Sequence, residues 1–161
     1  MNYDIRTARL DEQGEIGRLY HAVWRETQAA LQPPGVAAYR DEEFFIGRVK
    51  RFPITPLVAA SQGRLLGFAA WSGSYLGQLY VLPAGRNLGI GRALLERSES
   101  AIRSNGFDYA TLHCLVGNDS ARLFYERCYW HCAATLVEKA ETSNGPVEVA
   151  CWKMTKDLRR T

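Results

Sequence analysis

A chain of 161 residues with 47% hydrophobic and 23% charged residues is long enough for one domain with its own core, and this composition excludes extensive disorder. The net charge of +3 is too small to favour nucleic acid as a partner, and no apolar run approaches the roughly 20 residues of a membrane-spanning helix. The polar amino-terminal stretch MNYDIRTARLDEQ is unlike a secretory signal, so we expect a cytoplasmic protein.

A strand and two helices are predicted for the first third of the chain. The stretch YDIRTARL, residues 3–10, begins with an alternating pattern that predicts the strand. A helix is expected from about Asp11, its candidate cap, because apolar residues then recur at helical spacing up to Trp24. A Pro-Pro-Gly break after Gln32 ends this helix, and a second helix is expected over about residues 41–51.

A three-stranded meander is predicted for the middle of the chain. LVAAS at residues 57–61 and RLLGFAAWS at residues 64–72 have strand patterns, and the Gln-Gly pair between them is typical of a hairpin turn. YLGQLYVLP at residues 75–83 adds a third strand, which ends at its proline. We expect these three strands to pair in the order in which they occur.

Helices and strands alternate in the remainder of the chain. In order, they are a helix over about residues 89–104, a strand at 109–116, a short helix at 118–128, and strands near 130–139 and 147–155. The full order, βααβββαβαββ, predicts a single α/β domain over residues 1–161 with a mixed sheet at its centre.

The segment RNLGIGR, residues 86–92, lies between the meander and the next helix. It does not match a dinucleotide-binding fingerprint, because Leu94 stands where the third glycine belongs. A P-loop is also excluded, because it would need glycine and lysine at positions 90 and 91. What remains is an Arg-x-x-Gly-x-Gly segment that opens a helix, where backbone N–H groups and the helix dipole can hold a pyrophosphate.

The distribution of charge agrees with an anion site in this part of the chain. From Phe44 to Leu95 there is no Asp or Glu, whereas six Lys or Arg residues occur there. The middle of the chain is therefore expected to present a positive potential. A solvated basic face without a ligand is the alternative.

A second motif gives the glycine segment its context. In NDSARLFYERCYW, five residues match the pattern N-x-x-A-x-x-F-Y-E: Asn118, Ala121, Phe124, Tyr125 and Glu126. Together with LGQLYVLPAGRNLGIGRALLE and the order of elements, this motif resembles the GNAT superfamily of N-acetyltransferases, and the resemblance covers most of the chain. It implies a GNAT-like fold, a mostly antiparallel twisted sheet of about six or seven strands flanked by about four helices. It also implies transfer of an acetyl group from acetyl-CoA to a primary amine.

The resemblance implies which residues hold acetyl-CoA. The glycine segment would carry the pyrophosphate, and the N–H of Val81, at the end of the preceding strand, would be the oxyanion donor over the thioester carbonyl. The expected cofactor-binding residues are Val81, Arg86, Asn87, Leu88, Gly89, Ile90, Gly91, Arg92 and Asn118. No metal is expected, because the cysteines show no metal-ligand spacing and are interpreted as buried thiols: Cys114, Cys128, Cys132 and Cys151.

The chain departs from the family pattern at two positions. Tyr129 stands where relatives usually carry the glycine that ends the helix of the second motif. A tyrosine with positive φ costs on the order of 1 kcal/mol, so we expect that turn to differ. Gln78 stands where many relatives have a glutamate that acts as the general base, so the base must come from elsewhere.

Tyr125 is the expected general acid. A phenol of pKa about 10 can give a proton to a departing thiolate of pKa about 8.5 to 9 when the two are held together. The alternative is a core aromatic residue, because Ala121, Phe124, Tyr125 and Cys128 form a helical stripe. Within the family motif we favour the catalytic role.

His113 is the best candidate for the general base. It lies five residues before Asn118, on the strand between the two motifs, where some family members place a glutamate base. The ordinary pKa of histidine, about 6.5, suits proton abstraction at neutral pH. A half-buried structural histidine is one alternative, and Glu42 or Glu43 acting through water is another.

The sequence does not identify the acceptor, which is expected to be the amine of a small molecule or a peptide. Aromatic residues would line its pocket, with Trp24, Phe45 and Trp71 as candidates unless these are plain core residues. Family members are frequently dimers, so a homodimer is compatible with the resemblance. The rival function is a non-catalytic module on the same scaffold that binds acyl-CoA for regulation or interaction.

Overall fold

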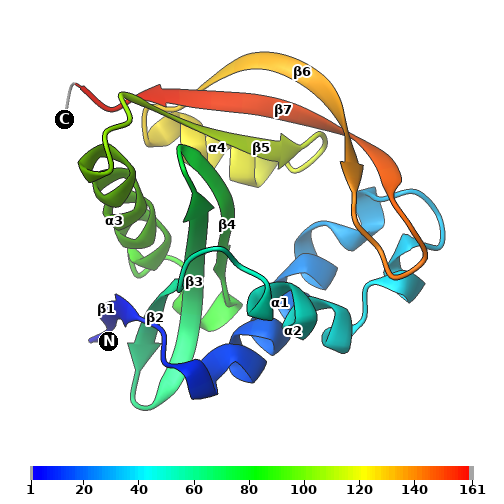
Figure 1. Ribbon diagram of the computed structural model, residues 1–161, viewed down its shortest axis with the longest axis horizontal. Coiled ribbons are helices and arrows are strands. Elements are labelled where there is room, and N and C mark those ends of the chain that lie inside the picture. Colours follow the sequence, from blue (N-terminus) through cyan, green and yellow to red (C-terminus); the bar gives the residue numbers. More distant parts are fainter. Residues whose placement is uncertain (1, 160–161) are drawn as a thin grey trace.

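Seven strands form one sheet in the computed structural model, which describes residues 2–159 (Figure 1). The strands are β1 (Asp4–Thr7), β2 (Leu57–Ser61), β3 (Arg64–Ser72), β4 (Tyr75–Val81), β5 (Tyr109–Leu115), β6 (His131–Ala140) and β7 (Val147–Asp157). Their order across the sheet is β1-β2-β3-β4-β5-β7-β6. All neighbouring strands are antiparallel except β4 and β5. The predicted mixed, mostly antiparallel sheet is therefore confirmed.

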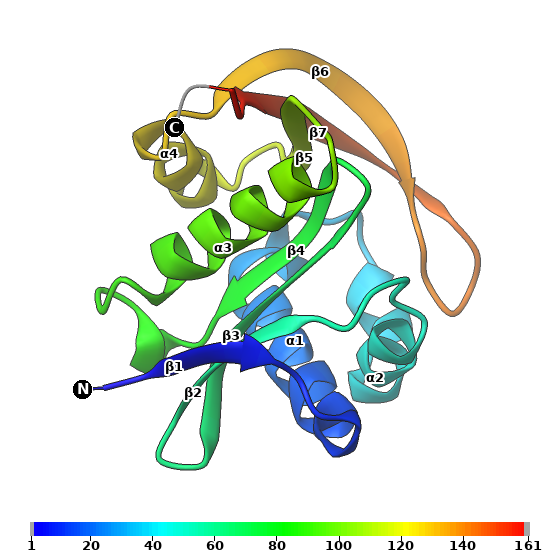
Figure 2. The ribbon, with the colours of Figure 1, turned by 60° about the vertical axis from the view of Figure 1, so that its left-hand side comes forward.

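Helices cover both faces of this sheet. Within the described residues the α-helices are α1 (Gln13–Thr27), α2 (Glu42–Lys50), α3 (Ile90–Ser104) and α4 (Asp119–Arg127). Short 3-10 turns occur at Leu10–Glu12, Ala29–Leu31, Val36–Tyr39 and Pro83–Gly85. The helices α1 and α2 pack around Phe68, whereas α3 and α4 pack on the other face, around Leu94 and Leu112. Figure 2 shows these two pairs of helices on opposite sides of β3 and β4.

The parallel neighbours β4 and β5 open a gap in the centre of the sheet. Within residues 2–159 they pair only at Tyr75 and Thr111, near their first residues. Beyond this pair the strands diverge, and Figure 1 shows β5 running away from β4. A bulge in β4 lies at the start of the gap, because Ala70 faces Gln78 and the next residue of β3 faces Leu76. The fold therefore leaves room for a ligand between two adjacent strands.

Helix α4 ends in a left-handed residue although that residue is a tyrosine. Tyr129 has a φ of 70°. Its N–H donates to the carbonyl of Glu126 and the N–H of Trp130 donates to the carbonyl of Tyr125, both at 3.0 Å, which is a Schellman arrangement. The expectation that this turn would differ is wrong. These bonds and the burial of Trp130, which is 2% exposed, outweigh a conformational cost of about 1 kcal/mol.

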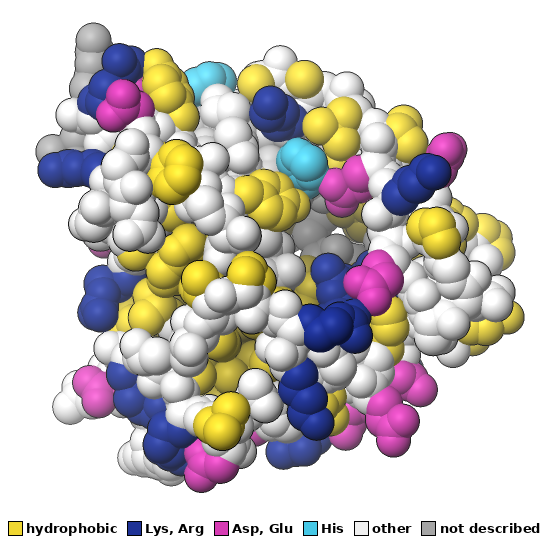
Figure 3. All heavy atoms as spheres, in the orientation of Figure 1, with side chains coloured by type: hydrophobic (Ala, Val, Ile, Leu, Met, Phe, Trp, Pro, Cys, Tyr) yellow, Lys and Arg dark blue, Asp and Glu magenta, His cyan; other side chains and the backbone are white. Residues whose placement is uncertain are grey.

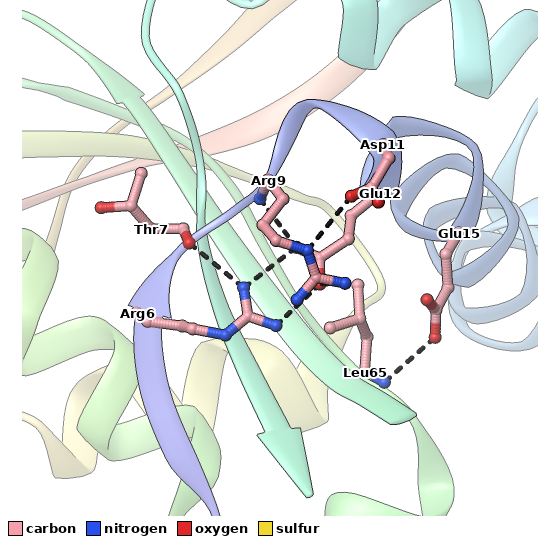
Figure 4. A network of polar contacts seen from close by, with 7 residues as sticks. All are labelled: Arg6, Thr7, Arg9, Asp11, Glu12, Glu15 and Leu65. Atoms are coloured by element: carbon pink, nitrogen blue, oxygen red, sulfur yellow. Dashed lines mark hydrogen bonds and ion pairs between the residues drawn. The ribbon is translucent and has the colours of Figure 1, made fainter. Parts of the chain in front are cut away.

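Glu12, rather than the expected Asp11, organises the start of α1 (Figure 4). The Glu12 side chain is buried, and it accepts hydrogen bonds from Nη2 of Arg6 at 2.7 Å and from the backbone N–H of Arg9 at 2.8 Å. Asp11 pairs at the surface with the side chain of Arg9, at 3.2 Å. The hydrogen bond from Arg6 lowers the pKa of Glu12 to about 2. One carboxylate thus ties β1 to the turn that precedes α1.

Candidate active site

A cavity of about 720 Å³ occupies the gap between β4 and β5. Its lining comes from both strands, from the end of α1, from residues 85–92 and from the beginning of α4. The glycine segment and the second motif, which are about thirty residues apart in the sequence, therefore border the same space.

Residues 86–92 form a loop whose backbone amides are available to an anion. Asn87 and Gly89 have φ values of 62° and 80°, and such left-handed residues turn successive N–H groups toward one side. Among the described residues, the N–H groups of residues 87–92 have no hydrogen-bond acceptor, and the first helical bond of α3 runs from Ala93 to Gly89. The positive end of the α3 dipole lies at the same place. This arrangement fits a bound diphosphate.

Two arginines flank this loop, and each is bound to a glutamate. Arg86 donates to Glu26 of α1, and its Nε donates to the carbonyl of Val81 at 3.3 Å. Arg92 donates to Glu96, one helical turn along α3, at 2.9 Å. Because a guanidinium group carries five N–H donors, both arginines keep donors that can reach phosphate oxygens beside the loop.

The backbone N–H of Val81 faces the gap. Leu82 donates to the carbonyl of Leu66 in β3 at 2.8 Å, so the N–H groups of β4 that face β3 belong to alternate residues. Val81 directs its own N–H and carbonyl the other way, and Arg86 meets the carbonyl there. The N–H of Val81 thus borders the cavity, beyond the point where β5 could pair with it.

Tyr125 of α4 lines the cavity. Its ring packs on Phe124 and Trp130, with centroid distances of 5.3 and 6.1 Å. Within residues 2–159 its hydroxyl has no hydrogen-bond partner. Burial raises the pKa of Tyr125, and the neighbouring Cys114 and Cys128 raise it further. The ring is therefore a packing element, while the phenol stays protonated at neutral pH and has a proton to donate.

His113 of β5 is held by a carboxylate. Its Nδ1 lies 2.5 Å from Oε2 of Glu138, a residue of β6. Its ring meets the ring of Tyr75 nearly edge-on, with the centroids 5.1 Å apart. Because Nδ1 is engaged by Glu138, Nε2 is the nitrogen that remains for chemistry at the cavity.

Glu138 is a site residue that the sequence analysis did not single out. It lies 25 residues from His113, and β7 stands between the two strands. His113 is opposite Lys153 of β7, and Glu138 is opposite Val149. Alternate residues of β7 share a face, so His113 and Glu138 point to the same side of the sheet. No local pattern in the sequence marks a contact made across an intervening strand.

The candidate acid and the candidate base lie on opposite faces of the sheet. Cys114 and Tyr125 belong to the cluster under α3 and α4. His113 precedes Cys114 on the strand and therefore points to the opposite face, where Tyr80 packs under α1 and α2. Both His113 and Tyr125 line the cavity, so the gap between β4 and β5 connects the two faces.

The profile of the Acetyltransferase (GNAT) family matches residues 16–129. The chain belongs to the GNAT family. The matched range contains the meander, the glycine segment and the second motif, so the resemblance seen in the sequence is confirmed. A comparison with curated proteins gives no significant match.

Solved structures of GNAT proteins share this fold. A GCN5-related N-acetyltransferase from Rhodopseudomonas palustris superposes with a TM-score of 0.77 at 20% identity, over 98% of this chain and 96% of that one. The paiA N-acetyltransferase of Thermoplasma acidophilum, solved with coenzyme A, gives 0.69 at 20% identity, over 98% and 99%. The yncA protein of Salmonella typhimurium, solved with acetyl-CoA, gives 0.69 at 19% identity, over 100% and 96%. At these identities the likeness shows the fold alone.

Most of the residues expected to hold the cofactor border the cavity of this GNAT protein. They are Val81, Arg86, Asn87, Gly89, Ile90, Gly91, Arg92 and Asn118. Ile90 is also 0% exposed, and its side chain packs in the core beside Leu94. Leu88 does not line the cavity, and it is 37% exposed.

The three aromatic residues expected in the acceptor pocket lie behind the cavity surface. Trp24 and Phe45 are 1% and 0% exposed and belong to the core under α1 and α2. Trp71 of β3 packs on the α3 side of the sheet. As placed, all three support the walls and none lines the cavity. Glu42 and Glu43, the alternative bases, are exposed in the first turn of α2.

The cysteines are free thiols. Burial raises the pKa of Cys114 to about 11 and that of Cys151 to about 12, so both are protonated at neutral pH. In the part of the chain that the structure describes, no group of three or more His, Cys, Asp or Glu could hold a metal ion. No helix in residues 2–159 combines the length and the apolar character needed to cross a membrane.

Proposed function

We propose that this GNAT protein transfers an acetyl group from acetyl-CoA directly to a primary amine of a small molecule or peptide. The observation that carries the proposal is the loop of free amides at residues 87–92, which lies at a gap that His113 and Tyr125 also line. Acetyl-CoA and free amines are both available in the cytoplasm, which is the compartment we propose.

Acetyl-CoA fits this site in two parts. The amides of residues 87–92, with Arg86 and Arg92 beside them, suit its diphosphate. The extended arm of the cofactor suits the gap, where the unpaired edge of β4 near Val81 offers backbone hydrogen bonds. The paiA and yncA proteins, solved with coenzyme A and acetyl-CoA, share the fold and support this assignment.

Tyr125 and Val81 would act on the thioester, which acetyl-CoA supplies as the activated acyl group. The N–H of Val81 donates to the carbonyl oxygen as negative charge develops on it. Tyr125, kept protonated by burial, donates its proton to the departing thiolate. Both groups reach the cavity from positions that packing or backbone geometry holds fixed.

His113 would act on the amine from the opposite face. An alkylamine of pKa about 10.4 is neutral less than about 0.1% of the time at pH 7, so proton removal limits its reactivity. Nε2 of His113 accepts that proton directly or through a water molecule, while Glu138 holds Nδ1 and stabilises the charged ring. This pair takes the place of the strand glutamate that Gln78 replaces.

Two measurements on the wild-type protein test the proposal. Calorimetry with coenzyme A reports cofactor binding, and thiol release from acetyl-CoA reports turnover with small amines, polyamines, antibiotics and peptide amino termini. We expect binding together with amine-dependent release. Binding without release from any amine would identify the non-catalytic module instead. No heat of binding to folded protein at millimolar coenzyme A would reject both functions.

A further inference from the structure

Two arginines on the α1–α2 face have no carboxylate partner. Arg40 lies just before α2, and Arg48 lies within that helix. Among residues 2–159, no Asp or Glu forms an ion pair with either of them. The nearby Arg51 differs, because it pairs with Glu141 at 2.7 Å. Within residues 2–159, neither Arg40 nor Arg48 is therefore held in an ion pair.

Arg40 is deeply buried for such a cation, since it is only 6% exposed. Its Cζ lies 5.3 Å from the ring centroids of both Trp24 and Phe44. Its Nε donates to the backbone carbonyl of Glu141 at 2.9 Å, which leaves its terminal nitrogens without an acceptor in the described chain. Burial lowers the pKa of Arg40, and the charge of Arg48 lowers it further. A bound anion would offset both effects.

Arg48 lies beside the same aromatic ring as Arg40. Its Cζ lies 5.8 Å from the ring centroid of Phe44, so both guanidinium groups border that ring. Its Cζ also lies 5.7 Å from the ring centroid of Tyr20, and the centroid of that ring lies 4.5 Å from that of Tyr80. Tyr80 lines the central cavity, and Tyr75 contacts His113.

The surface of the molecule is hollowed on this side. Figure 3 shows a deep hollow with Lys and Arg side chains gathered along one rim and a histidine beside an acidic side chain on the other. A molecule that enters this hollow would meet positive charge on one rim and a histidine side chain on the other.

We propose that the acceptor amine carries an anionic group, a carboxylate or a phosphate, that binds between Arg40 and Arg48. The inference rests on the proposed acetyltransferase function, because the same molecule must bring its amine to His113. Planar guanidinium groups suit the oxygens of both anions, and the aromatic rings hold the two arginines in position. Alkylamines that lack an anionic group would leave both guanidinium groups without a bound anion, and polyamines would be repelled.

The test compares acceptors that differ only in the anionic group. Phenylalanine is paired with phenethylamine and leucine with isoamylamine for the carboxylate, and phosphoethanolamine with ethanolamine for the phosphate. Thiol release gives kcat/KM for each, and calorimetry gives the affinity of each for the protein saturated with coenzyme A. We expect the acceptor with the anionic group to exceed its partner without that group about tenfold or more in one of the two arms, and that arm identifies the anion.

Two variants remove the same charge from different places on α2. Arg48→Gln alters the proposed site, whereas Lys50→Gln alters the exposed end of the helix and serves as the control. We expect Arg48→Gln to raise KM for the acceptor with the anionic group about tenfold. Its kcat, and both constants for the acceptor without that group, should change little. Lys50→Gln should behave as the wild type. Melting curves and the affinity for coenzyme A establish that each variant is folded.

The outcomes separate the two proposals. The anion site would be overturned if, in every pair, the acceptor without the anionic group reacts and binds as well as the one that carries it. An equal loss of activity toward both kinds of acceptor in Arg48→Gln would also overturn it. If no acceptor releases thiol but the anionic ones still bind more tightly by calorimetry, the anion site stands and the proposed reaction fails. Equal or absent binding in every pair overturns the site.

Discussion

The hydroxyl of Tyr125 can be removed without changing the contacts of its ring. In Tyr125→Phe the packing on Phe124 and Trp130 is kept, so the melting temperature and the affinity for coenzyme A should change little. We expect kcat to fall about a hundredfold or more, as for a lost general acid. Thiol release at saturating substrates measures the effect. Full turnover in the folded variant would end the acid role.

We expect variants of His113 and Glu138 to lower kcat to different extents. His113→Ala should lower kcat about a hundredfold and change the affinity for acetyl-CoA little, because His113 is proposed to act on the amine. Glu138→Gln keeps the shape but not the charge of this positioning residue, so we expect a smaller fall in kcat, about tenfold. Glu148→Gln, exposed on β7, is the matched control. A defect of His113→Ala confined to acetyl-CoA binding would refute its role as the base.

At the scale of elements, the loop before α3 depends on the left-handed conformation of Gly89, with a φ of 80°. Gly89→Ala strains that conformation by about 1 kcal/mol and turns the amides away from the ligand, so the affinity for coenzyme A should fall about tenfold or more. Gly63→Ala is a control, because Gly63 has a φ of 74° in the β2–β3 hairpin, away from the cavity. The two variants should lose a similar free energy of unfolding, but only Gly89→Ala should bind coenzyme A more weakly. Equal affinities of the two variants for coenzyme A would contradict the role of the loop.

The junction between β1 and α1 predicts a dependence of stability on pH. The pKa of Glu12 is lowered to about 2 in the folded protein, below its value of about 4.3 in the unfolded chain. The stabilisation is therefore present above about pH 4.3 and is lost as the pH falls toward 2. Glu12→Gln should lower the free energy of unfolding by about 1 to 3 kcal/mol at pH 7 and by less at pH 3. Denaturant titrations at pH 7 and pH 3 measure the free energy of unfolding. An equal loss at the two pH values would contradict the prediction.

The order of the elements is the part of the fold that local patterns predict well. Alternation and helical spacing placed β4 at residues 75–83 against an observed end at Val81, and the hairpin turn falls at Gln62 and Gly63, which have φ values of 51° and 74°. The first strand was predicted too long, because β1 ends at Thr7 where the chain turns toward Glu12. The ends of a strand depend on its pairing with strands that are distant in the sequence, so local patterns do not predict them.

At the scale of the whole molecule, the site depends on contacts that no local pattern contains. The glycine segment and the second motif were found because each is continuous in the sequence. The gap between β4 and β5 depends on strands joined by a long crossover, and the contact of Glu138 with His113 depends on β7 lying between them. The lack of an ion pair at Arg40 and Arg48 within residues 2–159 also depends on the folded structure, because Glu141 pairs with Arg51 instead.

The gap also makes the stability of the molecule sensitive to its ligand. The two parts of the sheet on either side of it are joined by strand pairing only at Tyr75 and Thr111 in the described chain, so a cofactor bound there adds contacts to both. Coenzyme A at about a hundred times its Kd should raise the free energy of unfolding by about 2.7 kcal/mol. Thermal melts with and without coenzyme A measure the shift. No rise at that concentration would contradict binding in the gap.

A sheet open through its centre also governs how two reactants are handled. In the proposed reaction, acetyl-CoA and the acceptor enter the cavity from opposite faces of the sheet. Neither bound molecule therefore blocks the opening through which the other enters. In that reaction both substrates are bound at the same time, and the acyl group passes directly between them without a covalent intermediate on the protein. A hybrid molecule that joins an anionic amine to coenzyme A through an acetyl bridge would be gripped at both ends, as a bisubstrate inhibitor.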